Sequence, residues 1–227
     1  YVMEFTGTDR AEAEKALENS VFVEFPDVEE FKAYYRNLAR DGLLKRSHLD
    51  IGFKDEDAFF EEFLDEDLHL RVISELGTDP GWTPPPVPPG QRLRVGYISQ
   101  DLHHLGLFVA EKEGFLERVG LRRGANLEVK TFANGVAVME AFKTGELDAS
   151  YLGGAPATLK RVNDDIRIRL LAGANEEGSA IVVRTGSAVR GVGDLRGKTV
   201  AVPAVGTAQY YLLLRVLEGA GLRASIR

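Results

Sequence analysis

Apolar residues recur at the three- and four-residue spacing of a helix through the first third of the chain. The clearest such stretch predicts a helix over residues 28–41, capped by Asp27 and ended by Gly42. Its apolar face consists of Val28, Phe31, Tyr34, Tyr35 and Leu38. We expect these aromatic side chains to form a core rather than a platform for a ligand.

Further helices are predicted before residue 77. One covers residues 10–19, and a second begins at Asp55 or Asp57, with residues 65–76 continuing or following it. The side chains of the second that turn inward are Phe59, Phe60, Phe63 and Leu64. His48 and His69 stand alone in this half and are expected on the surface.

From residue 93 onward, short apolar runs alternate with helical stretches. The predicted strands cover residues 93–98, 127–132, 149–152, 166–172 and 179–183. The predicted helices cover residues 102–113, 136–143 and 156–162. Repeated strand–helix–strand units indicate an α/β fold with a mixed, mostly parallel sheet flanked by helices, preceded by the helical N-terminal segment.

A proline-rich stretch separates the two patterns. Residues 77–90 hold six of the nine prolines, which fix φ and remove amide donors, so neither a helix nor a central strand can form there. We interpret the stretch as an extended linker in which Trp82 packs against a flanking body.

The net charge of the chain changes sign at the same place. Residues 1–90 hold 21 acidic and 9 basic residues, a net charge of −12, whereas the remaining residues hold 14 acidic and 19 basic, a net charge of +5. The acidic half is consistent with solvated helix surfaces.

The amino-acid composition excludes or argues against several classes of function. The chain has no cysteine, which excludes disulfides, thiolate metal sites and a cysteine nucleophile. Its net charge of −7 and pI near 5.3 argue against nucleic-acid binding. No apolar run reaches the roughly 18 residues of a membrane span, and no signal segment or anchor is visible.

Small and polar residues follow the predicted strands. Ligands of open parallel sheets bind outside the carboxyl ends of the strands, so these residues are the candidate binding site. They are Ser99, Gln100, Asp101, His103, Asn134, Gly135, Gly153, Gly154, Ala155, Asn175 and Glu177. Gly153 and Gly154 permit close approach to the backbone, and the amides at the helix start after them favour an anionic group.

Several of these residues have a second interpretation. Asp101 either binds a ligand amine or caps a helix, and Asn134 and Asn175 are either ligand donors or turn residues. His103 and His104 are adjacent on a helix, about 100° apart, which makes joint metal chelation awkward. Glu176 and Glu177 are paired carboxylates, better explained as solvated loop charges than as a catalytic pair. We therefore expect no metal, no cofactor and no catalytic residue.

Five motifs in this order resemble one protein family. They are Gly96-Tyr97-Ile98, residues 108–116, Gly120-Leu121, residues 145–149 and residues 194–203. Together they resemble the nitrate/sulfonate/taurine-type substrate-binding proteins of ABC transporters, over about residues 92–222. The residues that follow the first, second and fourth strands resemble an archaeal-type branch of that family.

The resemblance implies two lobes that grip a ligand and close by a hinge. Residues 91–190 would form the first lobe, and residues 191–227 the crossover and the start of the second. A helix there would begin near Thr207, which is then a further candidate ligand-binding residue. Residues 1–76 resemble the C-terminal tail of the family, so the order of segments predicts a circular permutation, a fragment of tandem units or a partial chain.

The function that this resemblance implies is solute capture. We expect the chain to bind a small polar or anionic molecule, such as a sulfonate, nitrate, bicarbonate or a pyrimidine. Its partners would be the membrane permease and ATPase of an importer, and its location extracytoplasmic. The alternative is an enzyme on the same scaffold, resembling pyrimidine-precursor synthases or menaquinone-pathway lyases. A transcription regulator's effector-sensing domain is a weaker option, because no helix-turn-helix precedes it.

Overall fold

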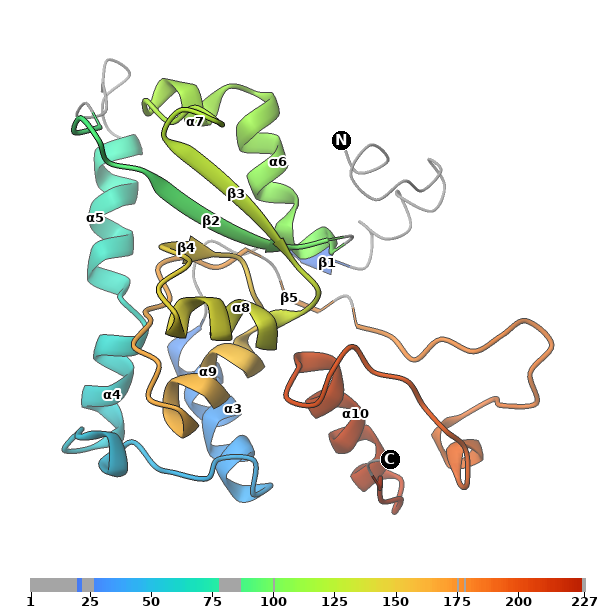
Figure 1. Cartoon of the computed structure of the whole chain (residues 1–227). Coiled ribbons are helices and arrows are strands. Elements are labelled where there is room, and N and C mark those ends of the chain that lie inside the picture. Colours follow the sequence, from blue (N-terminus) through green and yellow to red (C-terminus); the bar gives the residue numbers. More distant parts are fainter. Residues whose placement is uncertain are drawn as a thin grey trace.

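A computed structural model describes residues 20–21, 27–77, 87–99, 101–174, 176–177 and 179–225 of this chain. At its centre lies a parallel sheet of three strands in the order β3-β2-β4 (Figure 1). These strands are β2 (Leu93–Ile98), β3 (Leu127–Phe132) and β4 (Ala149–Ser150). Strand β2 pairs with β3 along its whole length, from Leu93 opposite Leu127 to Ile98 opposite Phe132. The predicted α/β fold with a mainly parallel sheet is confirmed.

Helices cover both faces of this sheet. Helix α6 (Leu105–Lys112) and the short α7 (Phe115–Arg118) lie on one face, and α8 (Gly135–Lys143) lies on the other (Figure 1). On the first face, Val95 and Leu127 pack with Leu107 of α6. On the second, Val138 and Ala141 of α8 pack with Ile98 and Phe132. Each crossover helix thus buries one apolar stripe against the strands beside it.

The acidic first half is helical over residues 27–77, as its pattern predicts. It contains α3 (Val28–Arg40), the 3-10 turn Leu49–Ile51, α4 (Glu56–Phe63) and α5 (Glu66–Gly77). The side chain of Asp27 accepts a hydrogen bond from the Glu30 amide, and that of Asp55 accepts one from the Ala58 amide. These two caps fix where α3 and α4 begin, because they satisfy amides that have no partner within the helix.

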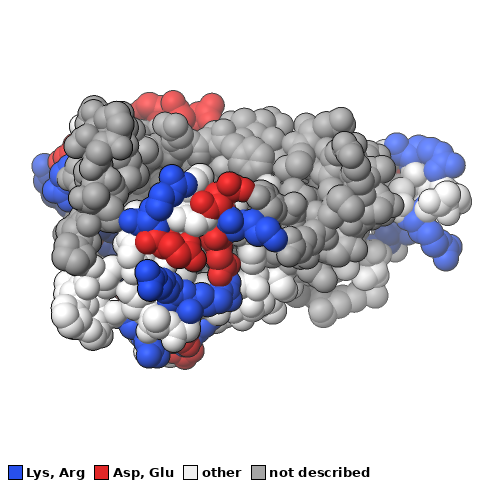
Figure 2. Space-filling model, turned by 90° about the horizontal axis from the view of Figure 1, so that it is seen from above, with Lys and Arg blue, Asp and Glu red and all other residues white. Residues whose placement is uncertain are grey.

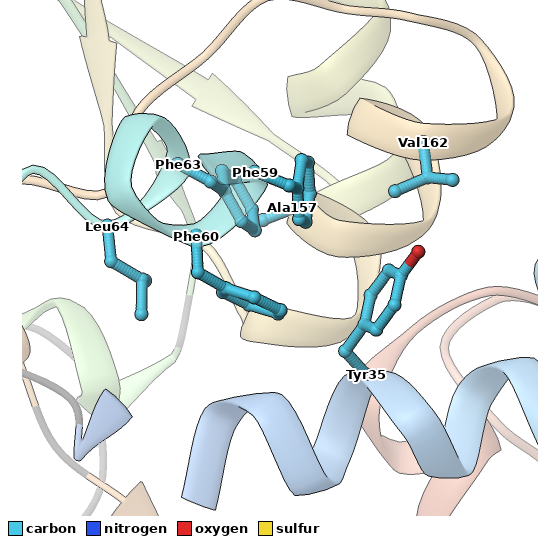
Figure 3. Close-up of a cluster of buried hydrophobic side chains, with 7 residues drawn as sticks. All are labelled: Tyr35, Phe59, Phe60, Phe63, Leu64, Ala157 and Val162. Carbon is cyan, nitrogen blue, oxygen red and sulfur yellow. The ribbon is translucent and has the colours of Figure 1, made fainter. Parts of the chain in front are cut away.

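These helices share a core with the second half of the chain. The cluster joins Tyr35 of α3 and three phenylalanines of α4 to α9 (Gly154–Asn163), as Figure 3 shows. Its fully buried members include Phe59, Phe60, Phe63, Ala157 and Val162. Neighbouring rings meet mostly edge to face, with centroids 5.4 Å apart for Tyr35 and Phe60. Residues 27–77 therefore fold against α9 and not as a separate body.

A buried arginine strengthens the same junction. Arg161 of α9 is 3% exposed, lies 5.4 Å from the ring centre of Phe53, and pairs with Glu62 at 3.1 Å and Asp165 at 2.9 Å. Its charge is compensated from both halves of the chain, because Glu62 belongs to α4. An arginine buried without such partners would destabilise the fold.

Helix α10 (Ala208–Gly219) joins the structure near the C-terminus. Tyr211 is buried with Leu38 and Leu159, and its ring meets Tyr34 edge to face at 5.1 Å. On its other side, Leu217 packs with Leu195 and Leu222 in a small core of its own. Helix α10 therefore bridges α3 and α9 to the last part of the chain.

Two predicted strands are wrong. Residues 166–172 make only a single bridge, between Leu170 and Leu64, and residues 179–183 are extended without a partner strand in the described part of the chain. The strand next to them is instead β5 (Glu176–Glu177), antiparallel to β1 (Ser20–Val21). Both runs are apolar and β-branched, but a strand forms only where a second strand lies alongside to complete its hydrogen bonds.

Other expectations meet a mixed outcome. His69 is buried and lies 3.1 Å from the Leu171 carbonyl through Nδ1, so its surface placement is wrong. Asp148 is structural, since its carboxylate accepts hydrogen bonds from Arg94. The predicted helix over residues 10–19 and the packing of Trp82 lie outside the described residues.

Phe63→Ala is expected to lower the free energy of unfolding by about 3–5 kcal/mol, because the ring is fully buried between α4 and α9. Urea unfolding at neutral pH measures this change. Leu70→Ala is the control on the neighbouring helix, where the side chain is 57% exposed and the expected change is within about 0.5 kcal/mol. Equal effects of the two substitutions would contradict the shared core.

Candidate functional site

The carboxyl ends of β2, β3 and β4 lie at one edge of the sheet, since the three strands are parallel. This edge carries most of the predicted ligand-binding residues. Gln100 and Asn175 lie outside the described residues, and Glu177 is described only as part of β5. The structure therefore places nine of the twelve candidates with their side chains or, for glycine, their backbone.

The helices that leave this edge begin close together. Asn134 caps α8 by accepting hydrogen bonds from the amides of Val136 and Ala137, both at 3.1 Å. A Cβ atom on Gly135 would lie 2.6 Å from the Pro156 ring of α9, so only glycine fits between the two helix starts. The side-chain oxygen of Asn134 is therefore used by the helix cap. Within the described residues its side-chain nitrogen has no hydrogen-bond partner and can still donate.

The start of α9 faces two helices that the sequence did not connect with it. A Cβ atom on Gly153 would lie 3.5 Å from Cβ of Ala208, at the start of α10. A Cβ atom on Gly154 would lie 3.2 Å from the ring of Phe31, on α3. Ala155 is 1% exposed and belongs to the packed interior rather than to a binding surface. Phe31 and Ala208 thus border the predicted site, although no local sequence signal places them there.

Thr207 caps α10 and completes this arrangement. Its hydroxyl donates to the Ala204 carbonyl at 2.8 Å and accepts from the Tyr210 amide at 3.3 Å, and the residue is 3% exposed. The preceding Gly206 approaches Val136 of α8, where an added Cβ would lie 3.7 Å from the valine side chain. The N-terminal ends of α8, α9 and α10 therefore meet at one edge of the sheet. Such ends present unpaired amides and positive partial charge.

Asp101 and His103 form a pair beside this edge. The carboxylate of Asp101 accepts a hydrogen bond from the His103 amide at 3.0 Å and lies 2.6 Å from Nδ1 of the imidazole. Burial raises the pKa of Asp101, but the hydrogen bond from His103 and the nearby imidazoles outweigh it, and the pKa lies below its usual value. Asp101 is thus an ionised group engaged with its own loop.

His104 is a structural residue that sequence reasoning left open. It is 2% exposed, and its Nδ1 accepts a hydrogen bond from the Ile98 amide at 2.8 Å at the end of β2. Its ring lies 5.6 Å from that of Tyr151, which follows β4. Burial lowers the pKa of His104 against the opposing effect of Asp101, so the imidazole is neutral with its proton on Nε2.

The remaining chemistry of this surface is limited. Among the side chains that the structure describes, no three histidine, aspartate or glutamate residues gather in a way that could hold a metal ion. None of the helices in the described ranges is long and apolar enough to cross a membrane. A cavity of about 260 Å³ lies at the opposite edge of the sheet, beside Arg92, Arg123 and Glu128, and does not coincide with the predicted site.

A parallel sheet with helices on both faces, whose crossover helices begin together at one edge, defines an α/β lobe. Residues 87–225 match the NMT1-like family, and because this is more than half of the chain, the chain belongs to that family. The predicted resemblance to substrate-binding proteins of ABC transporters is confirmed by this match.

Among solved structures, the periplasmic aliphatic sulphonate binding protein SsuA from Escherichia coli is similar to this chain. The identity is 19% and the TM-score 0.37, over 59% of this chain and 44% of that protein. The chain therefore spans less than half the length of SsuA. No curated protein matches the chain.

The burial of neutral His104 predicts a pH dependence of stability. Because its pKa is lowered in the folded state, the unfolded chain binds a proton more readily once the pH falls below about 6.5. Stability is then fully present above pH 6.5 and falls below it, with a slope of at most about 1.4 kcal/mol per pH unit from this residue. Urea unfolding between pH 5 and 8 measures the slope.

His104→Asn keeps an acceptor near the Ile98 amide but removes the titrating group. We expect this variant to show a shallower slope between pH 6.5 and 5 than the parent chain. If both chains lose stability equally over that range, His104 is not the responsible group.

Proposed function

We propose that this chain belongs to a solute-binding protein of an ABC importer and captures a small polar or anionic molecule. The observation that carries the proposal is the meeting of three helix N-terminal ends at the carboxyl edge of the sheet, in a member of the NMT1-like family. Amides at such ends bind oxyanions such as sulfonate, nitrate or bicarbonate without requiring a charged side chain.

The charge distribution supports the same class of ligand. Residues 91–227 carry a net charge of +5, although the whole chain carries −7. Asn134 adds a side-chain donor at the start of α8, as its nitrogen is not used by the helix cap. Gly153 and Gly154 leave the backbone at the start of α9 without side chains, which permits close approach of a ligand.

We assign the segments as the resemblance implies. Residues 91–190 are the first lobe, residues 191–227 the crossover and the start of the second lobe, and residues 77–90 a linker. Residues 1–76 correspond to the tail that such proteins pack on their first lobe. The packing of α3 and α4 on α9, and the antiparallel pairing of β1 with β5, support this assignment. In this arrangement the tail precedes the lobe along the chain.

The proposed role in an importer implies the partners of this protein and its location. A permease and an ATPase would accept the solute from the binding protein, which places it outside the cytoplasm. The site as described holds no poised acid, base and nucleophile together, so capture without chemistry is the function that we propose.

A screen by thermal shift with sulfonates, nitrate, bicarbonate, carboxylates and pyrimidines tests this function. A true ligand at 100 times its Kd stabilises the folded chain by about 2.7 kcal/mol. Calorimetry then gives the Kd of the best compound. Absence of stabilisation by all five classes would contradict the proposal, and turnover of any compound would favour the enzyme alternative.

Asn134→Asp separates the cap from the ligand contact. Aspartate caps a helix as well as asparagine does, so stability should change little, whereas anion affinity should fall at least about tenfold because a donor becomes a negative charge. Asn134→Ala should instead lose about 1 kcal/mol of stability. The matched control is Asp55→Asn, which exchanges the cap of α4, and it should leave the Kd unchanged. An unchanged Kd in Asn134→Asp would remove this residue from the site.

A further inference from the structure

Strand β3 lies at one end of the strand order, and in the described part of the chain only β2 pairs with it as a strand (Figure 1). The amide of Leu93 donates to the Asn126 carbonyl at 2.8 Å, where the ladder between β2 and β3 begins. The even-numbered residues of β3 therefore turn their backbone groups toward β2. The amides and carbonyls of Val129 and Thr131 point the other way, and Thr131 is exposed. We call the backbone of Val129 and Thr131 the open side of β3.

The amino end of β3 is closed to a further strand. The amide of Leu127 donates to the Arg122 carbonyl, and the carbonyl of Leu127 accepts from the Gly124 amide, both at 3.0 Å. The turn over residues 122–126 thus uses the backbone groups that Leu127 would offer to a neighbour. A strand that is added beside Thr131 and Val129 has to end at this turn.

The cavity at the amino ends of the strands lies where such a strand would end. Arg92, Arg123, Glu128 and Val129 are among the residues that line it. In Figure 2, which views the molecule from the side of α6 and α7, blue and red side chains lie next to one another, and Arg123 pairs with Glu111 at 2.8 Å. Arg92 is exposed and forms no ion pair with the residues that the structure describes. Its guanidinium can therefore bind a carboxylate.

This place is distant from the segment that leads toward the second lobe. Helix α10 approaches the sheet at the carboxyl ends of the strands, where a Cβ atom on Gly153 would lie 3.5 Å from Cβ of Ala208. The turn and the cavity lie at the amino ends. The start of the second lobe therefore does not cover them.

Lys130 lies between the two residues of the open side. Its ammonium is 3.7 Å from the Glu128 carboxylate. In an antiparallel pair, the residue opposite Lys130 would come within about 4.5 Å of it between Cα atoms, because this position is not hydrogen-bonded. An acidic residue there would form a favourable cross-strand pair, whereas a basic one would be repelled.

A second copy of the chain fits the open side poorly. Two β3 strands that both use Val129 and Thr131 would place the two Lys130 side chains opposite one another, and like charges there are destabilising. A register that sets Val129 opposite its counterpart avoids this repulsion. In that register, however, Thr131 faces Leu127, whose backbone groups are already bonded. A strand of different sequence and opposite charge suits the open side better.

We propose that the open side of β3 binds the acidic C-terminal end of a partner polypeptide as an added antiparallel strand. The partner's backbone would exchange hydrogen bonds with Val129 and Thr131, and an acidic side chain would face Lys130. The terminal carboxylate would enter the cavity beside Arg92. A strand whose carboxyl terminus lies at the amino end of β3 runs antiparallel to it. The inference goes beyond solute capture and does not depend on it.

Fluorescence anisotropy with a labelled peptide tests the proposal on the full chain. The probe is Thr-Val-Asp-Val-Ser with a free carboxyl terminus, which sets its aspartate opposite Lys130. One comparison peptide has an amidated carboxyl terminus, and another has lysine in place of the aspartate. We expect the probe to bind, and each comparison peptide to bind at least about tenfold more weakly, because each lacks one charged contact.

Arg92→Gln should weaken binding of the probe at least about tenfold, because a charge-assisted hydrogen bond to the terminal carboxylate is lost. The same substitution should leave the affinity for the amidated peptide unchanged. Arg167→Gln is the matched control, since Arg167 is likewise exposed but does not line the cavity. This control should bind the probe as the parent chain does.

Two substitutions on β3 test the pairing itself. Thr131→Pro removes an amide that points away from β2, so the sheet should keep its ladder while binding of the probe is lost. Lys130→Glu should reverse the preference between the two side chains, so that the lysine peptide binds more tightly than the probe. If Thr131→Pro lowers the melting temperature, the reversal in Lys130→Glu decides the question.

Four results would overturn the proposal. The first is that the probe does not bind, and the second is that the amidated peptide binds as tightly as the probe. The third is an unchanged preference in Lys130→Glu. The fourth is dimerisation of the chain that Thr131→Pro abolishes, since a second copy would then occupy the open side.

Discussion

The packing of aromatic side chains on α9 is the interaction on which the rest of the structure depends. Ala157 and Val162 of α9 pack against the phenylalanines of α4. The charge of the buried Arg161 of α9 is compensated by Glu62 of α4. The N-terminal end of α9 lies at the edge of the sheet, between α8 and α10. One helix therefore joins the acidic first half to the candidate site, so the position of that site depends on a core to which both halves contribute.

Much of the fold follows from local patterns. Strands β2 and β3 are predicted because each is an apolar run bounded by turn residues, and α3 and α4 because a capping aspartate precedes an apolar stripe. The runs at residues 166–172 and 179–183 have the same composition as strands. They fail to form strands because strand formation depends on a neighbouring edge, which no local pattern records. Leu170 finds only Leu64, and Val182 finds no strand in the described part of the chain.

The candidate site is predictable only in part, for a similar reason. The rule that ligands bind at the carboxyl ends of strands identifies Asn134, Gly135 and Gly153, and these residues do lie together. The rule does not show that Asn134 and Thr207 cap helices. Their hydrogen bonds in the structure show this role. Phe31 lies more than a hundred residues from Gly154 in sequence, and only tertiary packing brings them together.

Native-state hydrogen exchange of the α4 and α9 amides tests most directly whether the two halves form one structure. If the aromatic cluster unites them, the amides of Phe60 and Phe63 in α4 and those of Leu159 and Val162 in α9 should exchange with the same opening free energy. Their protection should also fall together in mild denaturant. Exchange of the α4 amides at a much lower free energy than those of α9 would contradict the account, because the first half would then open while the lobe stays folded.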